Sequence, residues 1–135
     1  MGRPVGHALS RLTPFLAVVA RRPYRPGAWD CALFAAAWVR ELTGRELVPD
    51  GAAYGTLAAG QALLAEAGHA DHVAYAAAHL TEVESWMRAQ EGDIAVVMDQ
   101  GHPCFGVVGS DVVHVLTPRG LGHVPLDAAV RVFRP

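Results

Sequence analysis

Cys31 is the residue of this chain that is best placed to act as a nucleophile. It follows Asp30 at the start of an apolar run, and aspartate is a favoured residue at the N-cap of a helix. The free N–H groups and the dipole of a helix N-terminus favour the thiolate, which is the reactive form of cysteine. The sequence therefore predicts a cysteine nucleophile in the first turn of a helix. The alternative is a small apolar side chain that packs in the core.

The N-terminal half of the chain is expected to supply the helices that position this thiol. Helices are expected over residues 8–21, from Cys31 to Thr43, and over residues 55–67, because apolar residues recur there near helical spacing. Gly44 is expected to stop the second helix. The core-facing positions of that helix are Cys31, Phe34, Ala35, Trp38, Val39 and Leu42.

Two intermediate segments carry weaker signals. Pro49 to Gly51 is expected to be a loop. Within residues 69–90, Thr81 to Glu84 fits a capping box, whereas Leu80 to Val83 also fits an extended segment. His69 and His72 stand three residues apart and could share a helix face, as a solvated pair.

From Gly92 onward the pattern changes to short apolar segments separated by turn residues. The segments lie at residues 94–98, 105–108, 112–116, 122–126 and 130–133. Closely spaced strands with short turns are typical of an antiparallel meander. The sequence therefore predicts a single α+β domain over residues 1–135, with N-terminal helices packed on a C-terminal antiparallel sheet of four or five strands.

Composition and charge exclude several functional classes. The chain has 135 residues, a net charge of −2 and 52% hydrophobic residues, so a globular fold is expected. Binding to nucleic acid is not expected, because it needs clustered Lys and Arg. Two cysteines are too few for a disulfide-stapled scaffold, and no segment is long enough to span a bilayer. No secretory signal is recognised, and synthesis in the cytoplasm is expected.

Several short motifs resemble those of NlpC-type papain-like cell-wall cysteine peptidases. Asp30-Cys31 resembles the D-C of the family's nucleophile, and Gly92-Asp93-Ile94 resembles the G-D-[LIV] that opens its first core strand. Phe105 to Gly109 resembles the V-G-I-x-x-G of the next strand, and Val113-His114-Val115 resembles the I-H-A of the third. The resemblance implies a papain-like (NlpC-type) domain.

A closer resemblance is to a set of phage and prophage tail-module proteins related to that peptidase family. It covers about residues 10–134 and rests on several spaced motifs. These are Trp29-Asp30-Cys31, Phe34, Trp38-Val39, Thr43-Gly44, Tyr54-Gly55-Thr56 and Gly92-Asp93. The resemblance implies a virion tail component made in the host cytoplasm, with tail hub or baseplate proteins as partners and peptidoglycan as a further candidate.

The resemblance also assigns roles within the candidate site. It implies that Cys31 is the nucleophile and that His114 orients the general base, but the base position itself holds Cys104. A thiol cannot shuttle a proton near neutral pH as an imidazole does. His102 could replace the base, although two residues along a strand is ~7 Å, a gap that only a bulge would close. In a papain-like fold the Cys104 side chain should point at Cys31.

Three functions follow from these readings. The first is a structural or adaptor protein of the tail tip with weak or lost peptidoglycan hydrolase activity. The second is an active cysteine amidase or peptidase that cleaves peptidoglycan stem peptides, with Cys31, His114 and His102 as catalytic candidates and no cofactor. The third is a metal-stabilised adaptor, in which Cys31, Cys104, His114 and His102 form a zinc site. A Cys31–Cys104 disulfide is a simpler variant, which a reducing cytoplasm opposes. Tyr54 is the aromatic residue considered as part of the site.

Overall fold

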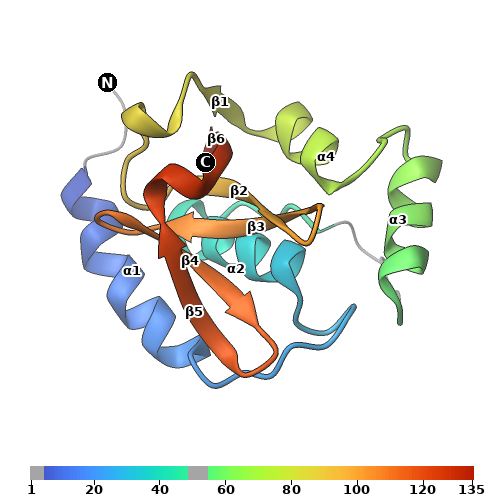
Figure 1. Ribbon diagram of the computed structural model, residues 1–135, viewed down its shortest axis with the longest axis horizontal. Helices are drawn as coiled ribbons and strands as arrows, with labels where there is room; N and C mark the ends of the chain where they lie inside the picture. The colour runs from blue at the N-terminus through green and yellow to red at the C-terminus, as the bar shows by residue number, and fades with distance from the viewer. Residues whose placement is uncertain (1–4, 49–54) are drawn as a thin grey trace.

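The computed structural model describes residues 5–48 and 55–135 and has an α+β fold (Figure 1). The helices are α1 (Val5–Val19), α2 (Cys31–Thr43), α3 (Leu57–Glu66) and α4 (His72–His79). The strands are β1 (Thr81–Val83), β2 (Ile94–Asp99), β3 (His102–Val108), β4 (Val112–Thr117), β5 (Gly120–Pro125) and β6 (Ala129–Arg134). The predicted order of helices first and sheet second is therefore confirmed.

The six strands form one antiparallel sheet in the order β1-β6-β2-β3-β4-β5. Strands β2 to β5 form the predicted meander, but β6 returns across the sheet and pairs with both β2 and β1. The sheet thus has six strands rather than the expected four or five, because Thr81 to Val83 adds one at the edge. Of the two readings for this segment, the extended one is confirmed and the capping box is wrong.

Helix α2 begins and ends where the sequence predicts. The Asp30 carboxylate caps it by accepting a hydrogen bond of 3.0 Å from the Leu33 N–H. Gly44 ends it in the left-handed conformation, at φ 77°, and its N–H donates to the Arg40 carbonyl. Aspartate at the N-cap and glycine after the last turn are the residues that satisfy free backbone groups at the two helix ends.

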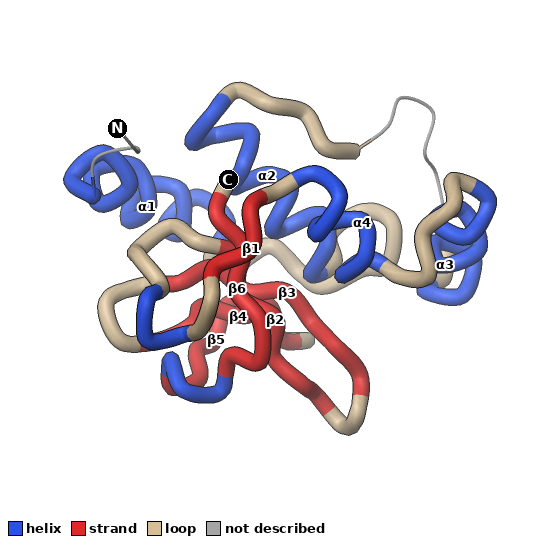
Figure 2. Tube along the Cα trace, turned by 90° about the horizontal axis from the view of Figure 1, so that it is seen from above, coloured by secondary structure: helices blue, strands red, loops and turns tan. Residues whose placement is uncertain are grey.

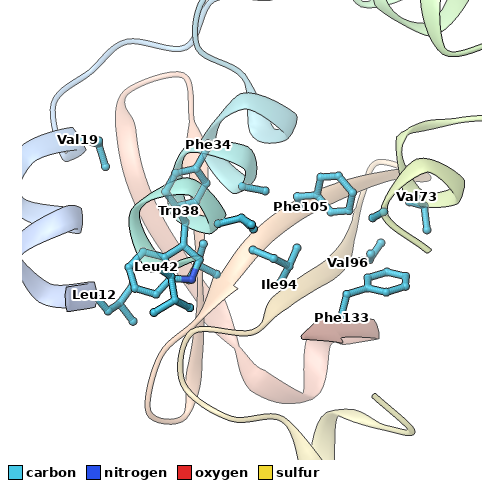
Figure 3. Packing of buried hydrophobic residues seen from close by; sticks show 14 of the residues in the cluster. Leu12, Val19, Phe34, Trp38, Leu42, Val73, Ile94, Val96, Phe105 and Phe133 are labelled. Atoms are coloured by element: carbon cyan, nitrogen blue, oxygen red, sulfur yellow. The ribbon is translucent and has the colours of Figure 1, made fainter. Parts of the chain in front are cut away.

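The main core lies between the helices and one face of the sheet (Figure 2). Helix α2 packs against both α1 and β3. Figure 3 shows Phe34 and Trp38 of α2 among Leu12 of α1 and Ile94 of β2. The Trp38 indole N–H also donates a buried 2.7 Å hydrogen bond to the Gly92 carbonyl, which ties α2 to the start of the sheet. A second cluster covers the other sheet face: Ala95, Val97, Val108, Val113, Ala129 and Val132.

The remaining helices differ from the expectation in their bounds and number. The first helix spans Val5–Val19, not residues 8–21, and the third ends at Glu66. Helix α4 was not foreseen; the Asp71 side chain caps it by accepting from the Ala74 N–H. None of the helices in the described ranges is long and apolar enough to cross a membrane. The expected loop from Pro49 to Gly51 lies outside the described residues, as does Tyr54.

Candidate functional site

The thiols of Cys31 and Cys104 meet between the start of α2 and β3. They form a side-chain hydrogen bond with each other. Both cysteines are free and partly buried. Cys31 packs against the main core, whereas Cys104 packs against the second cluster on the other face of the sheet.

The two thiols can meet because β3 is only half covered by its neighbour. Strand β4 pairs with β3 at Gly106 to Val108 alone, and Figure 1 shows the β4–β5 hairpin running away from the first half of β3. Cys31 takes up this edge: the Phe105 backbone N–H hydrogen-bonds its thiol. A strand edge left without a partner needs hydrogen-bond acceptors, and the first residue of α2 provides one.

Gly106 is the residue nearest the N-terminus of β3 that still pairs with β4. A Cβ on this residue would lie 2.5 Å from Val113 Cγ1 and 2.6 Å from the His114 carbonyl oxygen. Only glycine therefore allows the two strands to approach this closely here. The site begins at the next residues toward the N-terminus of β3, Phe105 and Cys104.

The loop before α2 is fixed by the same carboxylate that caps the helix. Asp30 is 2% exposed and also accepts a 3.0 Å hydrogen bond from the Gly27 N–H. This loop places Tyr24 beside the thiols. The pKa of the Tyr24 phenol is raised by burial and then by the neighbouring Asp30, Cys31 and Cys104. The sequence analysis missed Tyr24, which had no signal beyond its position in the turn before Cys31.

The thiol–thiol hydrogen bond separates the two pKa values. Donation from the Cys31 thiol lowers the pKa of Cys104 to about 7. The same hydrogen bond, followed by burial, raises the pKa of Cys31. The two thiols therefore titrate as a pair, in which each side chain shifts the pKa of the other.

The structure does not bring His114 to the thiols. It lies on β4 opposite Val107, which is three residues, or about 10 Å, along β3 from Cys104. Its ring packs against Gly109, where a Cβ would lie 2.7 Å from Nε2. Burial, and then the charge of His123, lowers the pKa of His114. These contacts are those of a histidine packed in a sheet.

His102 does not replace the missing base either. It is exposed at the start of β3 and lies opposite Asp99. The β2–β3 register runs without a shift from Ile94↔Val107 to Asp99↔His102, so the bulge that would bring His102 to Cys31 is absent from this ladder. Among the described residues no group of three or more His, Cys, Asp or Glu side chains could hold a metal ion. The zinc set of Cys31, Cys104, His102 and His114 is therefore not assembled.

The histidine that does contact this part of β3 is His72, which was expected to be solvated. Its Nε2 lies 2.8 Å from the Pro103 carbonyl oxygen, and its ring meets the Phe105 ring edge-on at 4.9 Å. His72 opens α4 directly after the capping residue Asp71. His72 thus contacts Pro103 and Phe105, the residues on either side of Cys104. The sequence signal for its position is Asp71, a favoured N-cap residue that would have predicted a helix beginning at His72.

The indole nitrogen of Trp29, two residues before Cys31, is an unusual polar atom. The side chain is 3% exposed, and its Nε1 has no hydrogen-bond partner among the described residues. The Arg22 guanidinium stacks over the ring at 4.2 Å from its centroid. Both residues line an open groove of about 660 Å³ between α1 and α2.

A comparison with protein families identifies the family to which the chain is similar. A family model described as a domain of unknown function (DUF6950) matches residues 7–135. No curated protein matches the chain.

Proposed function

The chain belongs to the DUF6950 family over residues 7–135, and on that premise we propose that it is a papain-like domain of the NlpC type that serves as a structural or adaptor component of a phage or prophage tail tip. In this role it contacts hub or baseplate proteins. Its ancestral chemistry, the cleavage of a peptidoglycan stem-peptide amide, is weak or lost.

One observation carries this proposal: Cys104 stands at the position that holds the general-base histidine in the NlpC-type peptidases that the chain resembles. In the peptidase mechanism the base takes the thiol proton, the thiolate attacks the carbonyl carbon, and the base returns the proton to the leaving amine. Here the residue at that position is a thiol, and its hydrogen bond with Cys31, followed by burial, raises the pKa of Cys31. The nucleophile is therefore held in its unreactive form.

The order of elements supports the same proposal. A helix led by a cysteine, followed by an antiparallel sheet, is the layout that the NlpC resemblance implies. The motif residues Gly92 and Asp93 lie directly before β2, and Asp93 is fully buried and paired with Arg134. The domain thus keeps interactions that stabilise the fold. At the nucleophile, in contrast, a thiol replaces the histidine that the NlpC-type peptidases use as general base.

The role is tested by proteomic analysis of particles purified from the phage or prophage that encodes the chain. We expect the chain in tail particles, and we expect the Cys31→Ala variant to be incorporated to the same extent. Absence of the chain from particles, or incorporation that depends on the Cys31 thiol, would overturn the structural role.

The chemistry is tested separately on purified peptidoglycan. We expect no release of stem peptide by the wild-type protein beyond that of Cys31→Ala. The matched gain-of-function variant is Cys104→His, which returns an imidazole to the base position and should increase the rate at which iodoacetamide alkylates Cys31 at neutral pH. Release of stem peptide that requires Cys31 in the wild-type protein would instead favour an active cysteine amidase.

A further inference from the structure

We propose that the groove between α1 and α2 binds the C-terminal end of a partner protein. Trp29 and Arg22 hold the terminal carboxylate, and the last side chain of the partner, which is apolar, lies on the floor of the groove. This inference goes beyond the tail-tip role and does not rest on it, because it concerns one surface of the domain.

The indole N–H of Trp29 is a buried hydrogen-bond donor that lacks an acceptor. The side chain is 3% exposed, and no group within residues 5–48 and 55–135 accepts from its Nε1. A buried donor without a partner costs free energy, so nearly all such groups in proteins are paired. Trp38 on α2 shows the usual arrangement, since its indole N–H donates to the Gly92 carbonyl at 2.7 Å. The unpaired N–H of Trp29 therefore points to an acceptor that a ligand supplies.

Arg22 places a positive charge beside this donor. Its guanidinium lies over the Trp29 ring, 4.2 Å from the centroid, and donates a 3.2 Å hydrogen bond to the Ala28 carbonyl. The side chain is exposed, so its rotation uncovers the indole to a ligand in the groove. In the described part of the chain no carboxylate forms a salt bridge with Arg22, and the exposed Arg21 and Arg25 add further positive charge. A carboxylate can accept hydrogen bonds from the guanidinium and from the indole with its two oxygens.

The floor of the groove suits an apolar side chain. The groove has a volume of about 660 Å³, which lies in the range of sites that bind small ligands. Apolar residues of both helices line it: Phe15, Val18, Val19, Leu33, Ala36 and Ala37. Val18 is 85% exposed, and a ligand that covers it removes apolar surface from water, which is favourable.

Charge distinguishes the two ends of the groove. Where α2 ends, Arg40 is already paired with Glu46 at 3.5 Å, and Glu41 lies beside them on the lining, so this end offers no free cation to a carboxylate. The end at Trp29 offers both a cation and a free N–H donor. A terminal carboxylate stands directly beside the last side chain of a peptide, and it therefore fits the Trp29 end with that side chain on the apolar floor.

The test follows the indole N–H resonances of the full chain in proton–nitrogen correlation spectra during titration with acetyl-alanyl-alanyl-leucine, which has a free carboxylate. We expect the Trp29 resonance to move and to saturate, because its proton gains an acceptor, while the Trp38 resonance stays in place. The same peptide with an amidated C-terminus should bind about tenfold more weakly. A Trp29 resonance that does not move, or equal binding of the acid and the amide, would overturn the proposal.

A third peptide tests whether the carboxylate must be terminal. It carries an internal aspartate before the leucine and an amidated C-terminus, so its charge equals that of the acid peptide. We expect it to bind as weakly as the uncharged amide. Binding as tight as that of the acid peptide would mean that any carboxylate is accepted, and would overturn the assignment of a chain terminus.

Three variants identify the groups that hold the carboxylate. Trp29→Phe keeps an aromatic ring without the N–H, and Arg22→Gln removes the charge. Each should weaken binding of a fluorescein-labelled acid peptide by about tenfold in fluorescence anisotropy. Arg40→Gln changes an arginine of the same groove that is already paired with Glu46, and this matched control should bind like the wild type. With circular dichroism confirming that all three are folded, equal affinities in the three variants would contradict the proposal.

Discussion

The ionisation of two thiols, Cys31 at the first residue of α2 and Cys104 on β3, is coupled, and this coupling governs the chemistry of the site. The sequence identified the position of Cys31, its capping residue Asp30, and Cys104 as the residue at the base position. It could not show how the pKa of Cys31 shifts, because the contact with Cys104 raises this pKa while the Phe105 backbone of β3 lowers it. The balance depends on the distance between two sulfurs from distant parts of the chain, which no local pattern encodes.

The coupled ionisation of the two thiols predicts how the alkylation of Cys104 depends on pH. In the wild-type protein the alkylation rate of Cys104 should rise with pH and reach half its maximum near pH 7, because its pKa is about 7 and only the thiolate reacts. Cys31→Ala removes the donor, so the midpoint should move upward toward the ordinary thiol value of 9.0. The rate of iodoacetamide labelling at Cys104, followed by mass spectrometry from pH 6 to 10, measures both midpoints.

A serine variant serves as the control for this titration. Cys31→Ser keeps a hydroxyl donor and should give a midpoint between those of the wild type and Cys31→Ala. Identical midpoints in all three proteins would mean that the thiol–thiol hydrogen bond does not control ionisation of Cys104.

At the scale of elements, the site exists because strands β3 and β4 pair over only part of their length. Short apolar runs and turn residues were sufficient to predict both strands and the start of α2. The point at which the strands part was not predictable, because it depends on the register of the two strands, which no local pattern encodes. The same holds for α4, whose histidine reaches β3 through long-range packing.

Strand β6 carries two arginine–carboxylate pairs that should differ strongly in energy. Arg134 binds the fully buried Asp93 through two hydrogen bonds, whereas Arg131 binds Glu82 at the exposed surface. Arg134→Ala leaves a buried carboxylate without its cation and should cost about 3–5 kcal/mol. Arg131→Ala should cost no more than ~1 kcal/mol.

Chemical denaturation of the two variants beside the wild type measures this difference. Because both arginines lie on β6 and both lose the same atoms on substitution, Arg131→Ala is the matched control. Equal losses of unfolding free energy would show that burial of Asp93 adds nothing to its pair.

At the scale of the whole molecule, the fold class and the division into helices and sheet were predictable. The six-strand order was not, because β6 crosses the sheet to lie between β1 and β2. Local spacing identifies a strand but not its neighbours, and the meander expected from short turns holds only for β2 to β5.

The position of β6 also constrains how the protein can fold during its synthesis. The strand nearest the C-terminus fills a gap between β1 and β2 and brings Arg134 to Asp93. On the ribosome, β1 therefore cannot join β2 to β5 in one sheet until residues 129–134 have emerged from the exit tunnel and formed β6 between them. The emergence of β6, rather than the appearance of the first helices, is therefore the event that permits cooperative folding.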